Sequence, residues 1–287
     1  MTGTATRAPA IAVGGIDWPA RWRQMVEARE AAGPGGFGAG GSRWEGRAER
    51  FARLTRALDP DTDPFVRVLT AALHPTDTVL DVGAGAGRYS LPVASMVRRL
   101  TAVEPSAGMR ASFAEELERR GITNVDIVGD SWENARVEQH DVVMVANVLY
   151  FVQRAVDFIE KLDQHARRAC FILHRVEERA AELGPLYEQV WGKPRPPEPG
   201  ALDLLNLLYS VGIRARLELG PRPAPVRFET AADVMREVRQ SIELLGDDTT
   251  HDARIGAFLK GVVTRRDGRY EFPPGPQMAI MSWEKST

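Results

Sequence analysis

The chain has 287 residues, a hydrophobic fraction of 44%, a charged fraction of 26% and a formal net charge of -2. This composition is ordinary for a globular protein with a sizeable core, and the charge gives no reason to expect nucleic acid or an anionic membrane as partner. The single cysteine excludes an internal disulfide, and no apolar run approaches the length of a membrane span. We therefore expect a cytoplasmic protein, either monomer or homodimer.

The N-terminal segment predicts a tail, a helix and a hinge. Residues 1–16 are small and lack periodicity, whereas Asp17 can cap a helix from Trp18 to about Ala32. Residues 33–41 are mostly glycine, which favours a flexible linker over regular structure.

A second helix is predicted from Arg43 to about Leu58, because Ser42 and Glu45 form a capping box. Its apolar residues, Trp44 among them, recur at spacings of three and four and so share one face. This face either packs in the core or covers a ligand as a lid, and the spacing leaves both open. A third helix is predicted from Asp63-Pro64 to about Leu73.

The next stretch has the pattern strand, glycine turn, helix. Val79–Val82 is largely apolar and β-branched, as a buried strand should be, and apolar residues at helical spacing follow from Leu91 to Val97. This arrangement points backbone N–H groups at a ligand, and glycine permits the ligand's close approach. The glycines between strand and helix are Gly83, Gly85 and Gly87.

Two details distinguish this turn from phosphate-binding turns. Arg88 stands where the dinucleotide fingerprint has its third glycine, and no Gly-Lys-Ser/Thr follows, which excludes a P-loop. Asp81 lies at the strand end, where a carboxylate suits a cationic ligand better than a pyrophosphate. The spacing therefore disfavours an NAD-dependent oxidoreductase.

A second strand, Leu100–Val103, ends in Glu104. Acidic residues at this position accept hydrogen bonds from ribose hydroxyls in dinucleotide-binding folds. Ser106 can cap the following helix, which is predicted to end near Arg120.

Val79–Gly87 resembles the first motif of class I S-adenosylmethionine-dependent methyltransferases, and Glu104-x-Ser106-x-x-Met109 resembles their second. The resemblance covers about Thr78 to His174. It implies S-adenosylmethionine as cofactor and an α/β fold, namely a doubly wound, mostly parallel, Rossmann-like sheet of seven strands with the last antiparallel. We accordingly expect residues 1–60 to form a tail and helical lid, and residues 61–287 to form the methyltransferase domain with C-terminal helical insertions.

The resemblance also implies which residues bind the cofactor. In the family, an acidic residue after the third strand, here Val125–Val128, contacts the adenine amino group, and its neighbour packs on the ring. Trp44-x-x-Arg47 is similar to an aromatic-rich segment that covers the cofactor in some small-molecule methyltransferases. The implied set is Trp44, Arg47, Asp81, Gly83, Gly85, Gly87, Glu104, Ser106, Asp130, Ser131, Trp132 and Asn147.

Two further strand ends are expected at the reacting centre. Asp141–Ala146 is a nearly continuous apolar run, typical of a strand buried on both faces, and Asn147 and Tyr150 follow it. Ala169–Leu173 predicts the fifth strand, with His174 at its end. Because ligands bind at the carboxyl ends of the strands in such sheets, we expect these side chains to face the methyl acceptor.

The C-terminal part predicts additions to the sheet and no second independent domain. A helical segment, Glu177–Trp191, is expected to break at Gly184-Pro185, and a proline-rich loop follows to Gly200. We expect Tyr187 and Trp191 to line the acceptor pocket. The other predicted elements are helices over 154–165, 201–211, 230–245 and 251–264, and strands over 213–219 and 278–283.

Methyl transfer from a sulfonium mainly requires a nucleophile held in line, and such positioning can be worth roughly 7–11 kcal/mol. No metal cluster is needed, and no residues show metal-ligand spacing. Asn147-Val148-Leu149-Tyr150 lacks the prolines typical of enzymes that methylate base amino groups.

These points favour an enzyme that methylates an oxygen or nitrogen of a small molecule, with His174 and Tyr150 as candidate catalytic residues. If a hydroxyl is methylated, His174 is the candidate general base. The alternatives are an RNA or protein methyltransferase, and a non-catalytic regulatory protein that binds S-adenosylmethionine.

Overall fold

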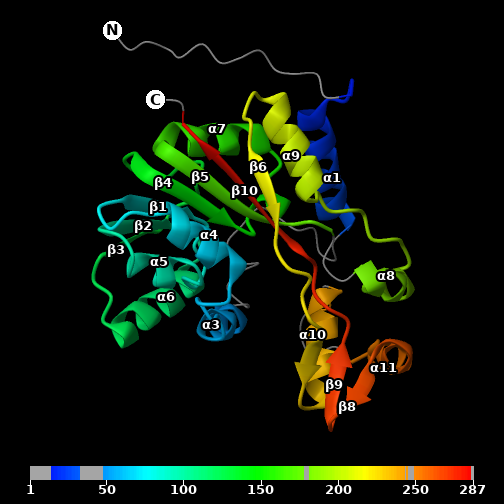
Figure 1. Cartoon of the computed structure of the whole chain (residues 1–287). Coiled ribbons are helices and arrows are strands. Elements are labelled where there is room, and N and C mark those ends of the chain that lie inside the picture. Colours follow the sequence, from blue (N-terminus) through cyan, green and yellow to red (C-terminus); the bar gives the residue numbers. More distant parts are fainter. Residues whose placement is uncertain (1–13, 33–47, 178–180, 243, 245–248, 286–287) are drawn as a thin grey trace.

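The computed structural model describes residues 14–32, 48–177, 181–242, 244 and 249–285 (Figure 1). Helix α1 (Trp18–Ala32) begins as predicted, since the Asp17 carboxylate accepts from the Ala20 N–H at 2.9 Å. Helix α4 (Pro64–Ala72) is likewise capped by Asp63. Between them, α3 spans Ala48–Arg56, and the predicted start of that helix lies outside the described residues.

Seven strands form one sheet in the order β3-β2-β1-β4-β5-β10-β6. The first five strands in this order are parallel, and β10 runs antiparallel to both of its neighbours, so the predicted topology is confirmed. The strands are β1 (Thr78–Val82), β2 (Arg99–Val103), β3 (Val125–Val128), β4 (His140–Ala146), β5 (Ala166–Arg175), β6 (Arg216–Leu219) and β10 (Met278–Glu284).

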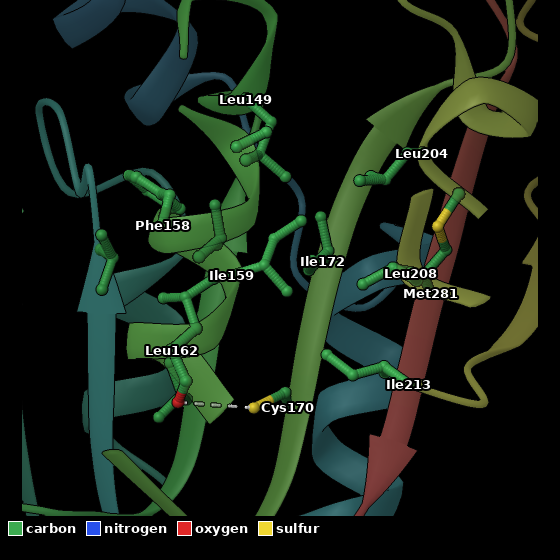
Figure 2. Packing of buried hydrophobic residues seen from close by; sticks show 14 of the residues in the cluster. Leu149, Phe158, Ile159, Leu162, Cys170, Ile172, Leu204, Leu208, Ile213 and Met281 are labelled. Atoms are coloured by element: carbon green, nitrogen blue, oxygen red, sulfur yellow. Dashed lines mark hydrogen bonds between the residues drawn. The ribbon is translucent and has the colours of Figure 1, made fainter. Parts of the chain in front are cut away.

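Helices cover both faces of this sheet because successive strand residues point to opposite sides. On β5, Cys170 and Ile172 join a cluster with α1, α7 (Ala155–His165) and α9 (Ala201–Ser210). Figure 2 shows Cys170 and Ile172 packed among leucines of α7 and α9. Phe171 and Leu173 face the other way, toward α4, α5 (Ser90–Ala94) and α6 (Ala107–Arg120). The core is therefore two apolar layers with the sheet between them.

A smaller three-stranded sheet, which the sequence analysis does not anticipate, stands beyond β6 and β10 (Figure 1). It comprises β7 (Val226–Phe228), β8 (Thr264–Arg266) and β9 (Arg269–Phe272). These strands are short and rich in arginine, so they carry no apolar alternation by which to recognise them. The Asp267-Gly268 turn between β8 and β9, with both φ angles positive, is the one hairpin signal they contain.

A third hydrophobic cluster joins this sheet to η2 (Ala181–Leu183), α8 (Gly184–Trp191), α10 (Ala231–Ser241) and α11 (Asp252–Val262). The predicted break at Gly184-Pro185 coincides with the boundary between η2 and α8, and Pro185 lies in the first turn of α8, where proline is tolerated. β5 is also longer than predicted and includes His174. Within the described residues, no helix is long and apolar enough to cross a bilayer.

Candidate functional site

The glycine turn leaves an open surface at the carboxyl end of β1. All three glycines have positive φ, between 57° and 81°. A Cβ on Gly83 would come within 2.4 Å of Val148, and one on Gly87 within 2.2 Å of the Phe113 ring, whereas one on Gly85 would meet no atom within 4 Å. Packing therefore demands two of the glycines, while Gly85 borders space that a ligand can occupy.

Glu104 lies beside this space and is held by backbone donors. One carboxylate oxygen accepts from the Gly85 N–H at 2.9 Å and the other from the Ser106 N–H at 2.8 Å. Burial raises the pKa of Glu104, and these two N–H groups and the charge of Arg110 partly offset that rise. The Ser106 hydroxyl accepts from the Met109 N–H at the start of α6, as predicted for a cap. Glu104 is thus a fixed acceptor at the end of β2.

Asp81 is a second buried carboxylate next to the turn, with an exposed fraction of 2%. Burial raises its pKa from 3.8 to about 7, the hydrogen bond from the Ser90 hydroxyl lowers it, and the nearby Glu104 raises it. A cation bound nearby would favour the ionised carboxylate. The sequence analysis did not identify Ser90 as a partner of Asp81. Ser90 is the first residue of α5, and a small polar residue directly after a glycine turn is the sequence feature that could have indicated it.

The residues predicted to bind adenine separate into two groups. Asp130 is exposed beyond the end of β3 and accepts from the Ser131 N–H at 2.8 Å. Trp132 is buried under α7, where its indole N–H donates to the Phe158 carbonyl at 3.2 Å. The structure therefore brings Asp130 and Ser131 to the edge that holds Glu104, but places the Trp132 ring in the core.

Asn147 and Tyr150 lie at the carboxyl end of β4. Asn147 is exposed and has a φ of 61°, uncommon for a residue with a side chain. The Tyr150 hydroxyl donates to Asn147 Oδ1 at 3.2 Å and accepts from the Arg175 N–H at 2.7 Å. Burial raises the pKa of Tyr150 to about 12, so its hydroxyl stays protonated.

His174 is enclosed within the protein. Its side chain has no exposed surface, its Nε2 lies 3.0 Å from the Pro199 carbonyl, and its ring is stacked on Tyr150 at 4.1 Å between centroids. Burial lowers its pKa to about 3, which keeps it neutral at physiological pH. The carbonyl contact assigns the proton to Nε2. The structure does not bring His174 to the open edge where a general base for the acceptor is expected.

The strand order places the remaining candidate site residues side by side at the carboxyl ends of the strands. Strands β3, β2, β1, β4 and β5 are consecutive and parallel, so their carboxyl ends lie side by side. The residues at or just after these ends are Asp130, Glu104, Asp81 with the glycine turn, Asn147 and Arg175. Arg175 is, after Ser90, a second residue that the sequence does not single out, because the predicted strand ends two residues earlier.

The residues predicted to form the lid and to line the acceptor pocket remain to be located. Trp44 and Arg47 lie outside the described residues, and α3 packs beside α6 with Arg56 paired to Glu116 at 3.2 Å. Tyr187 is buried in the third hydrophobic cluster, and Trp191 packs against that cluster. Among the described residues, no group of three or more His, Cys, Asp or Glu side chains is arranged to hold a metal ion.

Comparisons with known proteins agree with this geometry. Residues 79–169 match the family described as "Methyltransferase domain". An uncharacterized Haemophilus influenzae protein is 29% identical over 143 residues, which are 49% of this chain and 52% of that protein. A ribosomal RNA small subunit methyltransferase A of Desulforapulum autotrophicum is 25% identical over 42% of this chain and 43% of its own. The chain thus spans about half the length of the curated relatives it matches.

Solved structures share the fold at low sequence identity. A candidate methyltransferase of Bacillus halodurans superposes with a TM-score of 0.53 at 15% identity, covering 77% of this chain and 97% of its own. The YcgJ protein of Bacillus subtilis gives a TM-score of 0.51 at 12% identity, with the same two coverages. These likenesses establish the fold of the larger sheet and its helices.

Proposed function

Residues 79–169 are a class I, S-adenosylmethionine-dependent methyltransferase domain, and we propose that the chain transfers a methyl group to an oxygen or nitrogen of a small molecule. The observation that carries this proposal is the pairing of Glu104 with the glycine turn. A carboxylate fixed by two backbone N–H groups lies beside the open surface at Gly85. This arrangement suits a ligand that presents ribose hydroxyls to the carboxylate and passes close to the turn.

The buried groups at the site fit S-adenosylmethionine in charge as well as in shape. Each Glu104 oxygen makes one hydrogen bond and has a further lone pair for a ribose hydroxyl. Asp81 is buried with a raised pKa, so a cation beside it would compensate the cost of its charge. When bound, the cofactor supplies an electrophilic methyl group on a positively charged sulfur.

We assign the other roles by position along the sheet edge. Asp130 and Ser131 follow β3 and are proposed to contact the adenine, while Asn147 follows β4 and is proposed to lie at the methyl end of the cofactor. In the same proposal, the helical lid of the N-terminal segment is the helix that carries Trp44 and Arg47 over the cofactor, whereas α1 packs in the core. α3 suits this role because it packs beside α6, whose first turn adjoins Glu104.

A small-molecule acceptor is favoured over an RNA base by the surroundings of Tyr150. Its ring has the His174 imidazole at 4.1 Å and the Arg175 guanidinium at 3.7 Å from its centroid. Two groups this close cannot share one face, so both faces of the ring are covered. A flipped base therefore finds no stacking surface on Tyr150, although aromatic stacking is a usual means of holding one. The similarity to a ribosomal RNA methyltransferase spans less than half of either chain.

The proposal is tested by incubating the protein with methyl-labelled S-adenosylmethionine and, separately, with a small-metabolite extract, total RNA and a protein extract. We expect label in the small-metabolite fraction, and loss of that label in Glu104→Ala but not in Glu115→Ala, an exposed residue of α6. Label in the RNA or protein fraction alone would contradict the small-molecule acceptor. Cofactor binding without transfer to any fraction would favour the regulatory alternative.

A further inference from the structure

The acceptor end of the site is organised by Tyr150, whose ring and hydroxyl are both fully engaged. His174 covers one face of the ring and Arg175 the other. The hydroxyl accepts from the Arg175 backbone N–H at 2.7 Å and donates to Asn147 Oδ1 at 3.2 Å. Because both faces of its ring are in contact with protein groups and its hydroxyl proton is donated to Asn147, Tyr150 acts as a positioning residue for Asn147.

The hydrogen bond from Tyr150 fixes which end of the Asn147 amide faces outward. The carbonyl oxygen is held by Tyr150, so the two N–H donors of the amide are left for a ligand. Asn147 is exposed and has its backbone in the left-handed region, directly after β4. The carboxyl end of β4 thus presents hydrogen-bond donors to a ligand.

Arg175 adds a charged donor at the neighbouring strand end. Its guanidinium is fixed by the Tyr150 ring and by an ion pair of 3.0 Å from Nη1 to Glu198. The side chain is 13% exposed, and its Nε is shielded from solvent and makes no hydrogen bond. Buried donors without an acceptor are rare in folded proteins, and the edge of a guanidinium matches the two oxygens of a carboxylate.

We propose that the methyl acceptor is a small molecule that carries a carboxylate, which the Nε edge of Arg175 and the amide N–H groups of Asn147 bind. The inference rests on the proposed methyl transfer and specifies its substrate class. An amine acceptor would instead need carboxylates or lone pairs at this end of the site. Two such groups at this end already have partners, since the Asn147 oxygen accepts from Tyr150 and Glu198 pairs with Arg175.

The test compares three ligands that share one ring and differ in charge. Benzoate, benzyl alcohol and benzylamine are titrated by calorimetry into protein saturated with S-adenosylhomocysteine, at constant ionic strength and neutral pH. We expect wild-type protein to bind benzoate about tenfold or more tighter than the other two, as a charge-assisted hydrogen-bond pair allows. The affinity for S-adenosylhomocysteine is measured in each protein as the control for the cofactor site.

Two variants and one matched control locate the effect. Arg175→Gln should abolish the preference for benzoate, and Tyr150→Phe, which keeps the ring but releases the Asn147 amide, should reduce it. Arg167→Gln, at the opposite end of the same strand and 49% exposed, should leave it unchanged. Arg175→Gln and Arg167→Gln should bind S-adenosylhomocysteine as tightly as the wild-type protein, and the benzoate preference of Tyr150→Phe is compared at saturation with S-adenosylhomocysteine.

Equal binding of the three ligands, a preference for benzylamine, or no benzoate binding by the folded, saturated wild-type protein would overturn the inference. So would an unaltered benzoate preference in Arg175→Gln, which would mark the anion as adventitious. If the wild-type protein fails to bind S-adenosylhomocysteine at all, the proposed function itself fails, and the two failures are thereby distinguished.

Discussion

Asp81→Asn is expected to stabilise the free protein at alkaline pH, although it alters a residue of the proposed site. Asp81 is 2% exposed, and burial raises its pKa from 3.8 to about 7. At pH values between these two pKa values, Asp81 is protonated in the folded protein but ionised in the unfolded chain. The free energy of unfolding therefore falls as the pH rises toward 7. At about 1.4 kcal/mol for each pKa unit, the buried charge costs on the order of 4 kcal/mol above pH 7.

Asparagine has a similar shape, can still accept from the Ser90 hydroxyl, and carries no charge. The difference in unfolding free energy between Asp81→Asn and the wild-type protein should therefore widen by about 3 kcal/mol from pH 5 to pH 8. Urea unfolding at several pH values measures it, with Asp126→Asn, an exposed carboxylate on β3, as control. Parallel pH profiles for Asp81→Asn and wild type would refute the assignment of a raised pKa to Asp81.

The same carboxylate should couple cofactor binding to protons. A positively charged ligand beside Asp81 lowers its pKa, so the protein should release a proton on binding S-adenosylmethionine below about pH 7. Affinity should then rise with pH through this range, and Asp81→Asn should bind more weakly and without the pH dependence. Calorimetry in two buffers of different ionisation enthalpy detects the proton, and no buffer dependence would place the cation elsewhere.

Three further predictions concern the turn, the buried histidine and the N-terminal segment. Gly87→Ala should lose about 2–5 kcal/mol of stability in urea unfolding, because its φ is positive and its Cβ would overlap Phe113, whereas Gly85→Ala should lose only about 1–2 kcal/mol. Equal losses would contradict the packing described. His174→Phe should cost about 1–3 kcal/mol through the Pro199 contact and leave the pH profile of turnover unchanged; a profile that shifts would restore His174 as the base. Trp44→Ala should weaken S-adenosylmethionine binding in a protein that keeps α1, and unchanged affinity in calorimetry would exclude a lid at this residue.

The fold could be predicted largely from local signals in the sequence. Val79–Val82 and Asp141–Ala146 are apolar enough to identify buried strands, and the glycine turn between β1 and α5 has a backbone geometry that few other residues tolerate. Glu104 could also be identified, because the apolar strand β2 can be predicted from the sequence and Glu104 directly follows it. Such features depend on neighbours within a few residues along the chain.

The acceptor end of the site depends instead on contacts between distant segments. His174 looks available in the sequence, but it is enclosed by Pro199 and by Trp22 of α1, whose ring lies 5.9 Å from its own. Trp132 is likewise drawn into the core by Phe158 of α7. No local pattern encodes these contacts, so the sequence could locate the strand ends without showing which side chains remain open there.

The most direct test of the cofactor site is a calorimetric titration of the purified chain with S-adenosylmethionine and, separately, with NAD. The account predicts saturable binding of S-adenosylmethionine and none of NAD. It also predicts that Glu104→Ala loses about 1–3 kcal/mol of binding free energy, because ribose hydroxyls lose their acceptor, while Glu115→Ala binds normally. Saturable NAD binding, or S-adenosylmethionine binding that Glu104→Ala does not weaken, would contradict the placement of the cofactor at the glycine turn.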